Sequence, residues 1–164
     1  KLDGENGVIK SGCNYIILRT SWVFSKYGKN FLKTIINLSK HKKNLGIVDD
    51  QYGCPTYAKD IAIATSKVIS FINNKNYSGI YNYCGDFKCS WYEFANKIIF
   101  LNNDTNTNDL ILTRTNSEEY FTDAPRPKNS VLNCEKYINT FGESFTNIDD
   151  AIKIVVDDLK NKNN

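Results

Sequence analysis

Hydrophobic positions along the chain switch repeatedly between the spacing typical of strands and the spacing typical of helices. Short continuous apolar runs predict strands at residues 15–19, 45–48, 79–83 and 110–113. Apolar residues three or four positions apart predict helices at residues 2–11, 31–38, 58–72, 91–101 and 148–159. Because strands alternate with helices, we expect an α/β architecture with at least partly parallel strands. The strand at 15–19 is expected to be buried on both faces.

Three of the helix starts carry capping signals. Ser90 and Glu93 have the spacing of a capping box. Thr146 and Asp149 have a similar spacing, and Thr56 is expected to cap the helix that follows it. The inner face expected for that helix consists of Ala58, Ile61, Ala62, Thr65, Val68, Ile69 and Ile72.

The composition is that of one ordinary globular domain. The chain has 164 residues, of which 41% are hydrophobic and 24% charged, and its net charge is +3. No apolar run approaches the ~18 residues of a membrane-spanning helix, and no charged-then-apolar leader is visible. We therefore expect a cytoplasmic protein with no membrane contact. The sequence contains no Met and begins at Lys1, from which we expect that an N-terminal part is missing.

Basic residues and cysteines exclude several classes of site. The 18 Lys residues are scattered among acidic ones, and the one dense basic run, at 40–43, lies at a predicted helix end, so we expect no nucleic-acid partner. Five Cys without a C-x-x-C pair, and a single His, predict reduced thiols and no metal site. Arg is rare, so Arg19, Arg114 and Arg126 are expected where a planar guanidinium is needed.

No complete catalytic motif is present. The sequence contains no G-x-G-x-x-G, P-loop, Tyr-x-x-x-Lys pair or Gly-x-Ser-x-Gly. Candidate residues instead follow the predicted strand at 15–19, where ligands of α/β sheets bind. Trp22 either forms the wall of a site for a planar or sugar ligand or fills the core, and Arg19 either binds phosphate or closes an ion pair. Arg126, between two prolines, either binds a diphosphate or ties a loop to the body.

Five motifs in this order resemble the C-terminal half of the dTDP-4-dehydrorhamnose reductases, a branch of the extended short-chain dehydrogenase/reductase family. They are R-T-S-W-V-F at 19–24, G-x-N-F at 28–31, D-Q-x-G-x-P-T at 50–56, S-W-Y-E-F-A at 90–95 and R-P-x-N-S-x-L at 126–132. The resemblance implies an α/β fold: the C-terminal part of a Rossmann-like doubly wound sheet plus a smaller substrate-binding α/β subdomain. Residues 1–164 are then the rear of the Rossmann-like domain interleaved with that subdomain, and the N-terminal dinucleotide-binding half is absent.

The resemblance also implies an activity. It is the NAD(P)H-dependent reduction of dTDP-4-dehydro-L-rhamnose to dTDP-L-rhamnose by the parent protein, with NADPH or NADH bound mainly by the absent half. The partner is a small-molecule nucleotide sugar, and a homodimer is left open. This segment alone is expected to be inactive, because the family's catalytic Tyr would lie four residues before Lys1. The alternatives are a non-catalytic reductase-like regulatory or binding subunit and a reductase of another nucleotide sugar.

The same resemblance assigns roles to five residues. Lys1 matches the catalytic Lys, which stabilises the phenolate of the proton-donating Tyr and holds the nicotinamide ribose. Thr20 and Ser21 match positions lining the nicotinamide end of the cofactor site. Trp22 matches the Trp that contacts the deoxysugar, and Arg126 is expected at the nucleotide end of the substrate. No metal ligand is implied.

Overall fold

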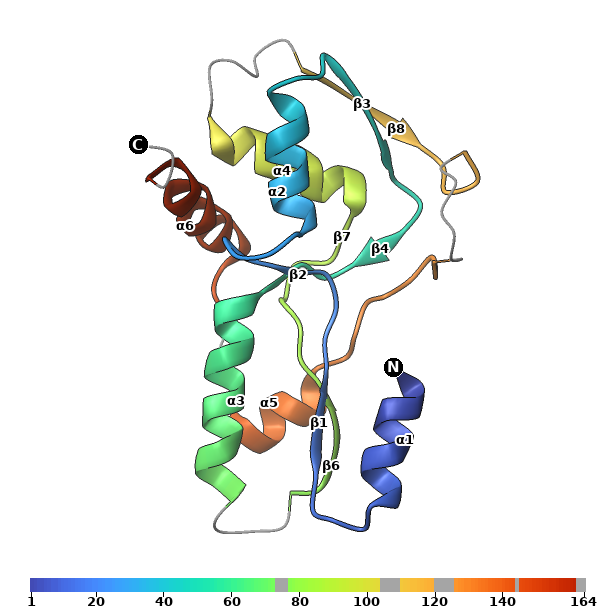
Figure 1. Cartoon of the computed structure of the whole chain (residues 1–164), viewed down its shortest axis with the longest axis vertical. Coiled ribbons are helices and arrows are strands. Elements are labelled where there is room, and N and C mark those ends of the chain that lie inside the picture. Colours follow the sequence, from blue (N-terminus) through green and yellow to red (C-terminus); the bar gives the residue numbers. More distant parts are fainter. Residues whose placement is uncertain (73–76, 104–109, 120–125, 144, 162–164) are drawn as a thin grey trace.

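The computed structural model describes residues 1–72, 77–103, 110–119, 126–143 and 145–161, which form an elongated molecule with two parts (Figure 1). The lower part in that view contains α1 (Leu2–Lys10), β1 (Ile16–Arg19), α3 (Ala58–Ile72), β6 (Gly79–Asn82) and α5 (Glu135–Phe141). The upper part contains α2 (Phe31–Ser39), β3 (Asn44–Val48), α4 (Trp91–Asn102), β8 (Ile111–Thr115) and α6 (Ile148–Asn161). The other described strands have two residues each: β2 (Val23–Phe24), β4 (Tyr52–Gly53), β5 (Thr56–Tyr57) and β7 (Cys89–Ser90).

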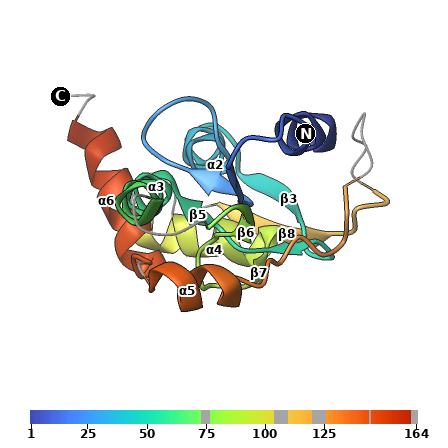
Figure 2. The same ribbon diagram turned by 90° about the horizontal axis from the view of Figure 1, so that it is seen from below.

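The described strands pair two by two. The pairs β1–β6, β2–β5 and β3–β8 are parallel, whereas β4–β7 is antiparallel. In both ribbon views the β1–β6 pair lies between α1 on one side and α3 with α5 on the other (Figures 1 and 2). The prediction of alternating strands and helices with partly parallel pairing is thereby confirmed.

Strand β1 is less buried than the sequence predicts. Its residues Ile16, Ile17 and Leu18 are half-buried, and Arg19 is exposed. Among the described strands, β1 has β6 as its one partner, so only part of its apolar surface is covered. The prediction of burial on both faces is therefore wrong for the described chain.

The capping signal at Ser90 is confirmed, whereas those at Thr56 and Thr146 are wrong. The Ser90–Glu93 capping box is complete at the start of α4. The Thr56 side chain instead donates to the Cys54 carbonyl and accepts from the Gly85 amide. Thr146 likewise donates to Asp60, at 2.6 Å. The amide of Asp149 at the start of α6 donates to the Asn147 side chain, so Asn147 caps this helix in place of Thr146.

The buried stripe of α3 also differs from the predicted one. Ala64 and Val68 are its buried apolar residues, whereas the predicted Ala62, Thr65 and Ile69 are exposed. The side chain of Ile72, also predicted on the inner face, lies outside the described part of the chain. The stripe is set by α5, whose Tyr137 donates a hydrogen bond to the Ala64 carbonyl.

Each part has its own hydrophobic core. The lower core consists of Ala64, Val68, Tyr81, Tyr83, Tyr137 and Phe141. The upper core is larger and packs α2, α4 and α6 against β3 through fully buried side chains that include Leu32, Ile35, Phe94, Ile98 and Ile152. Within the described residues, no helix combines the length and the apolar character needed to cross a bilayer.

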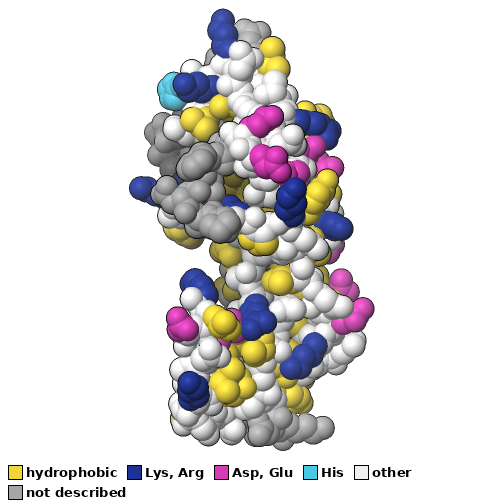
Figure 3. All heavy atoms as spheres, turned by 90° about the vertical axis from the view of Figure 1, so that its right-hand side faces the viewer, with side chains coloured by type: hydrophobic (Ala, Val, Ile, Leu, Met, Phe, Trp, Pro, Cys, Tyr) yellow, Lys and Arg dark blue, Asp and Glu magenta, His cyan; other side chains and the backbone are white. Residues whose placement is uncertain are grey.

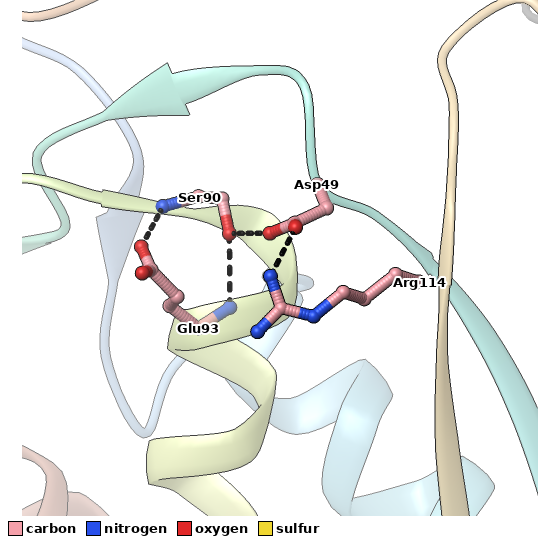
Figure 4. Close-up of polar contacts among 4 residues, drawn as sticks. All are labelled: Asp49, Ser90, Glu93 and Arg114. Atoms are coloured by element: carbon pink, nitrogen blue, oxygen red, sulfur yellow. Dashed lines mark hydrogen bonds and ion pairs between the residues drawn. The ribbon is translucent and has the colours of Figure 1, made fainter.

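A polar network fixes the start of α4 to the β3–β8 pair (Figure 4). Ser90 donates to one oxygen of Asp49 and accepts from the Glu93 amide. The other Asp49 oxygen pairs with Arg114, whose guanidinium also lies 4.4 Å from the ring centroid of Tyr92. Arg114, one of the three arginines of the chain, therefore has a structural role. Through Asp49 it holds the start of α4, the helix that begins with Trp91.

Replacing Ser90 by alanine is expected to lower the free energy of unfolding by about 2 kcal/mol, because a helix cap and a buried hydrogen bond are lost together. Chemical denaturation measures this change. The control is Ser70→Ala, which removes a hydroxyl from an exposed position of α3 and should change stability by less than ~0.5 kcal/mol. Equal effects of the two substitutions would show that the network does not stabilise the fold.

Candidate functional site

A cleft of about 940 Å³ opens at the junction of the two parts. Its wall includes all five residues to which the sequence assigned roles: Lys1, Thr20, Ser21, Trp22 and Arg126. The molecule narrows at this level, where hydrophobic side chains reach the surface and Lys or Arg side chains lie above and below (Figure 3). The wall is thus partly apolar and partly cationic.

Trp22 is held in a strained and well-defined position. Its φ of 47° lies in the left-handed region, which is rare for a bulky residue and costs ~1–3 kcal/mol. Its indole stacks on that of Trp91, with ring centroids 3.5 Å apart and planes 10° from parallel. The half-buried indole lines the cleft and also packs against the upper core, so the structure gives it parts of both roles left open by the sequence.

Gly53 is required for this position. A Cβ added at Gly53 would overlap the indole of Trp22 directly, so the ring lies flat on bare backbone. The Thr56 amide also donates to the Trp22 carbonyl at 3.1 Å, which ties the residue to β5. The D-Q-x-G-x-P-T motif therefore acts as the support of the tryptophan.

We expect Gly53→Ala to displace the Trp22 indole. Because closely stacked indoles couple electronically, the Trp22–Trp91 pair should contribute to the near-UV circular dichroism, and the substitution should change this aromatic signal. The matched control is Gly7→Ala on α1, where an added Cβ meets no atom within 4 Å. An unchanged near-UV spectrum in Gly53→Ala would contradict this packing of the indole on Gly53.

Lys1 and Thr20 are exposed on the cleft wall, whereas Ser21 is half-buried. The Ser21 hydroxyl donates its proton to the Cys54 carbonyl at 3.1 Å. Ser21 can therefore accept a hydrogen bond from a ligand but has no second proton to donate. Lys1 makes no ion pair with a residue in the described ranges, which leaves its ammonium group for a ligand.

Arg19 forms an ion pair with Glu5 of α1. The Arg19 Nη2 atom lies 2.6 Å from the Glu5 carboxylate, and Nε donates to both carboxylate oxygens at 3.1 Å. This hydrogen bonding lowers the pKa of Glu5 and raises that of Arg19. Of the two roles left open for Arg19, the ion pair is therefore the observed one, and it fixes α1 beside the cleft.

Arg126 is exposed at the join between the main cleft and a neighbouring basin of about 590 Å³, since it lines both. The segment after it is extended along β4: the Tyr52 amide donates to the Lys128 carbonyl, and the Ser130 amide donates to the Tyr52 carbonyl. Among the described residues Arg126 makes no ion pair or hydrogen bond, so the ties between this segment and the body come from its neighbours and not from the Arg126 guanidinium. Pro125, the other predicted flank, lies outside the described residues.

Sequence reasoning missed three residues of this site. Trp91, interpreted from the sequence only as part of a helix start, lines both the cleft and the basin and stacks on Trp22. Gln51, with 9% of its surface exposed, also lines both, and Lys29 lines the basin. All three lie within the ranges of the five motifs, and this position was the sequence feature that could have identified them as site residues.

The site can bind an elongated anionic ligand with a flat or sugar-like end. Arg126 and Lys29 face the basin, and a guanidinium suits a diphosphate. The cleft presents an indole wall together with the ammonium group of Lys1. Such a layout separates a region for charge recognition from a region where a ring can lie against an aromatic surface.

Comparison with known proteins shows the family to which the chain belongs. A sequence model of the family described as RmlD substrate binding domain matches residues 1–161. The dTDP-4-dehydrorhamnose reductase of Sinorhizobium fredii is 35% identical over 159 residues, which cover 95% of this chain and 54% of that protein. The chain spans about half the length of the curated relatives it matches first.

Two solved structures have the same fold. A crystal structure of a dTDP-4-dehydrorhamnose reductase from Clostridium acetobutylicum has a TM-score of 0.86 and 36% identity, over 98% of this chain and 54% of that one. The reductase from Bacillus anthracis, in complex with NADP, has a TM-score of 0.81 and 31% identity, over 96% and 53% of the two chains. The predicted resemblance and the α/β, Rossmann-like fold class are confirmed.

Proposed function

We propose, since the chain belongs to the RmlD substrate binding domain family, that it forms the sugar-nucleotide side of a dTDP-4-dehydrorhamnose reductase. The proposed reaction is the NAD(P)H-dependent reduction of dTDP-4-dehydro-L-rhamnose to dTDP-L-rhamnose. The observation that carries the proposal is the convergence of Lys1, Thr20, Ser21, Trp22 and Arg126 on one cleft. Thr20, Ser21 and Trp22 are consecutive residues of one motif, whereas Lys1 and Arg126 lie far from them in the sequence, and nothing in the sequence order requires these three parts of the chain to meet.

The proposed organisation places residues 1–164 at the rear of a Rossmann-like domain, interleaved with the substrate-binding subdomain. The dinucleotide is then bound mainly by a separate N-terminal half. The relatives support this division, because the chain covers only about half their length and one of them is a complex with NADP. The present residues fit the nicotinamide end of such a cofactor, since an ammonium and two hydroxyl-bearing side chains line the cleft.

When bound, a reduced nicotinamide supplies the hydride that reduces the C4 ketone. The new alkoxide needs a proton, and a tyrosine delivers it efficiently only if its phenol pKa is lowered. We assign Lys1 to this task, because a nearby ammonium group stabilises the phenolate. Lys1 would also hold the ribose hydroxyls of the cofactor, and Thr20 and Ser21 would line its nicotinamide end.

The substrate is proposed to lie with its deoxysugar against Trp22 and its diphosphate at Arg126. The indole provides a flat apolar surface for the C–H groups of the sugar and excludes water from the ketone. The strained φ of Trp22 supports a binding role, because strain of this kind is retained where a side chain must point in one direction.

A spectrophotometric assay of NADPH oxidation tests the proposal. The full-length gene product should turn over dTDP-4-dehydro-L-rhamnose, and residues 1–164 alone should not. Absence of turnover in a well-folded full-length protein that still binds the nucleotide sugar would favour a non-catalytic binding or regulatory subunit. Faster turnover of another 4-keto nucleotide sugar, in a substrate panel, would reassign the substrate.

A further inference from the structure

Cys54, Cys84 and Cys134 lie together near the end of β6, and none of their thiols has a role in the site described above. Cys84 follows β6, Cys134 precedes α5, and the two sulfur atoms are 3.5 Å apart. The Cys84 amide also donates to the Cys134 sulfur at 3.3 Å, so the two residues face each other. Both thiols point at the Leu132 carbonyl, at 3.8 and 3.9 Å.

We propose that Cys84 and Cys134 form a reversible, peroxide-sensitive dithiol, in which oxidation closes a disulfide and a thiol reductant reopens it. The sulfur atoms must approach from 3.5 Å to about 2.05 Å, a change that side-chain rotation can provide. The described residues contain no group of three or more side chains placed to hold a metal ion, so nothing in them points to metal binding at these thiols.

Exposure and ionisation single out Cys134 as the thiol that meets the oxidant. Cys134 is half-buried, whereas only 1% of the Cys84 surface and 4% of the Cys54 surface are exposed. The hydrogen bond from Cys84 lowers the pKa of Cys134 to about 7, so much of it is thiolate near neutral pH. Burial instead raises the pKa of Cys89 to about 12, which makes that thiol inert.

The chemistry requires only hydrogen peroxide. The Cys134 thiolate attacks one peroxide oxygen, the O–O bond breaks, and the departing hydroxide takes a proton to become water, leaving a sulfenic acid. The Cys84 sulfur then attacks the Cys134 sulfur, the S–O bond breaks, and the Cys84 proton leaves with the hydroxyl group as a second water. Overall the two thiols lose two hydrogen atoms, and one peroxide becomes two waters.

The bond would connect the end of β6 to the segment that forms one wall of the cleft, because Leu132 lies two residues before Cys134 and lines it. The inference does not depend on the proposed reductase activity. Cys54 is the competing partner, since contact with Cys84 lowers its pKa as well. The test must therefore distinguish a Cys84–Cys134 bond from a Cys54–Cys84 bond.

Peptide mapping of the full-length protein under non-reducing conditions makes this distinction. After treatment with hydrogen peroxide and alkylation of the remaining thiols, the dominant linked peptide should join Cys84 to Cys134, and dithiothreitol should remove it. Cys13→Ser, at an exposed cysteine, and Cys54→Ala should leave the yield unchanged. In Cys84→Ser, the sulfenic acid trapped at Cys134 by dimedone should rise several-fold.

The wild-type map decides the question even if a variant folds poorly. A dominant Cys54–Cys84 link would overturn the proposal. So would oxidation of Cys134 to sulfinic acid without any link to Cys84, because it would show that the buried thiol does not reach its neighbour in time.

Discussion

In the full-length protein, Lys1→Met should lower kcat for reduction of dTDP-4-dehydro-L-rhamnose at least about 100-fold, which is the low end of the contribution of positioned proton transfer. The substitution keeps a long side chain but removes the ammonium group from the cleft. The phenol of the proton donor then returns towards its ordinary pKa, and the ribose loses a hydrogen-bond donor. Steady-state NADPH oxidation measures the change, and the KM for NADPH should rise with it.

Lys10→Met is the matched control for this substitution. Lys10 is an exposed lysine at the opposite end of α1, and it does not line the cleft. Its replacement should leave kcat and KM within a factor of about two, since exposed substitutions of this kind are usually near neutral. A normal kcat in Lys1→Met would show that Lys1 has no catalytic role.

Trp22→Ala should lower kcat/KM for the nucleotide sugar by roughly 30-fold, because a tryptophan at a binding surface is typically worth about 2 kcal/mol. The indole wall disappears, and Trp91 loses its stacking partner. Most of the loss should be in KM for the sugar substrate, while KM for NADPH stays within a few-fold. Steady-state kinetics with each substrate varied in turn separates the two.

Trp22→Phe provides the comparison, because it keeps a flat aromatic surface on the same strained backbone. It should retain most of the activity that Trp22→Ala loses. The core role left open by the sequence predicts a different pattern. If Trp22→Ala unfolds more easily but its folded fraction has unchanged kinetic constants, the indole is a packing residue and not a substrate wall.

Local signals in the sequence predicted most of the fold. The capping box at Ser90 depends on two residues three positions apart, so no distant group is needed to form it. Thr56 fails as a cap because its hydroxyl accepts from the amide of the distant Gly85. Thr146 donates to the distant Asp60, and its neighbour Asn147 accepts from the Asp149 amide at the start of α6 in its place. Local spacing carries no information about such partners.

The candidate site was predictable in its membership but not in its geometry. Motifs singled out Trp22 and Arg126, yet the stacking of Trp22 on Trp91 and its contact with Gly53 arise only when β4, β7 and the end of β1 meet. Arg19 had two open roles, and only the position of α1 shows that Glu5 is its partner. The Cys84–Cys134 contact is of the same kind, because no spacing rule brings these two residues together.

A crystal structure of the full-length protein with dTDP-L-rhamnose bound tests the central claim most directly. The rhamnose ring should lie against the indole of Trp22, with Lys1 on the side of its C4 hydroxyl and the diphosphate beside Arg126. A nucleotide sugar bound in a hollow that includes neither Trp22 nor Arg126 would contradict the assignment of this cleft as the sugar-nucleotide site.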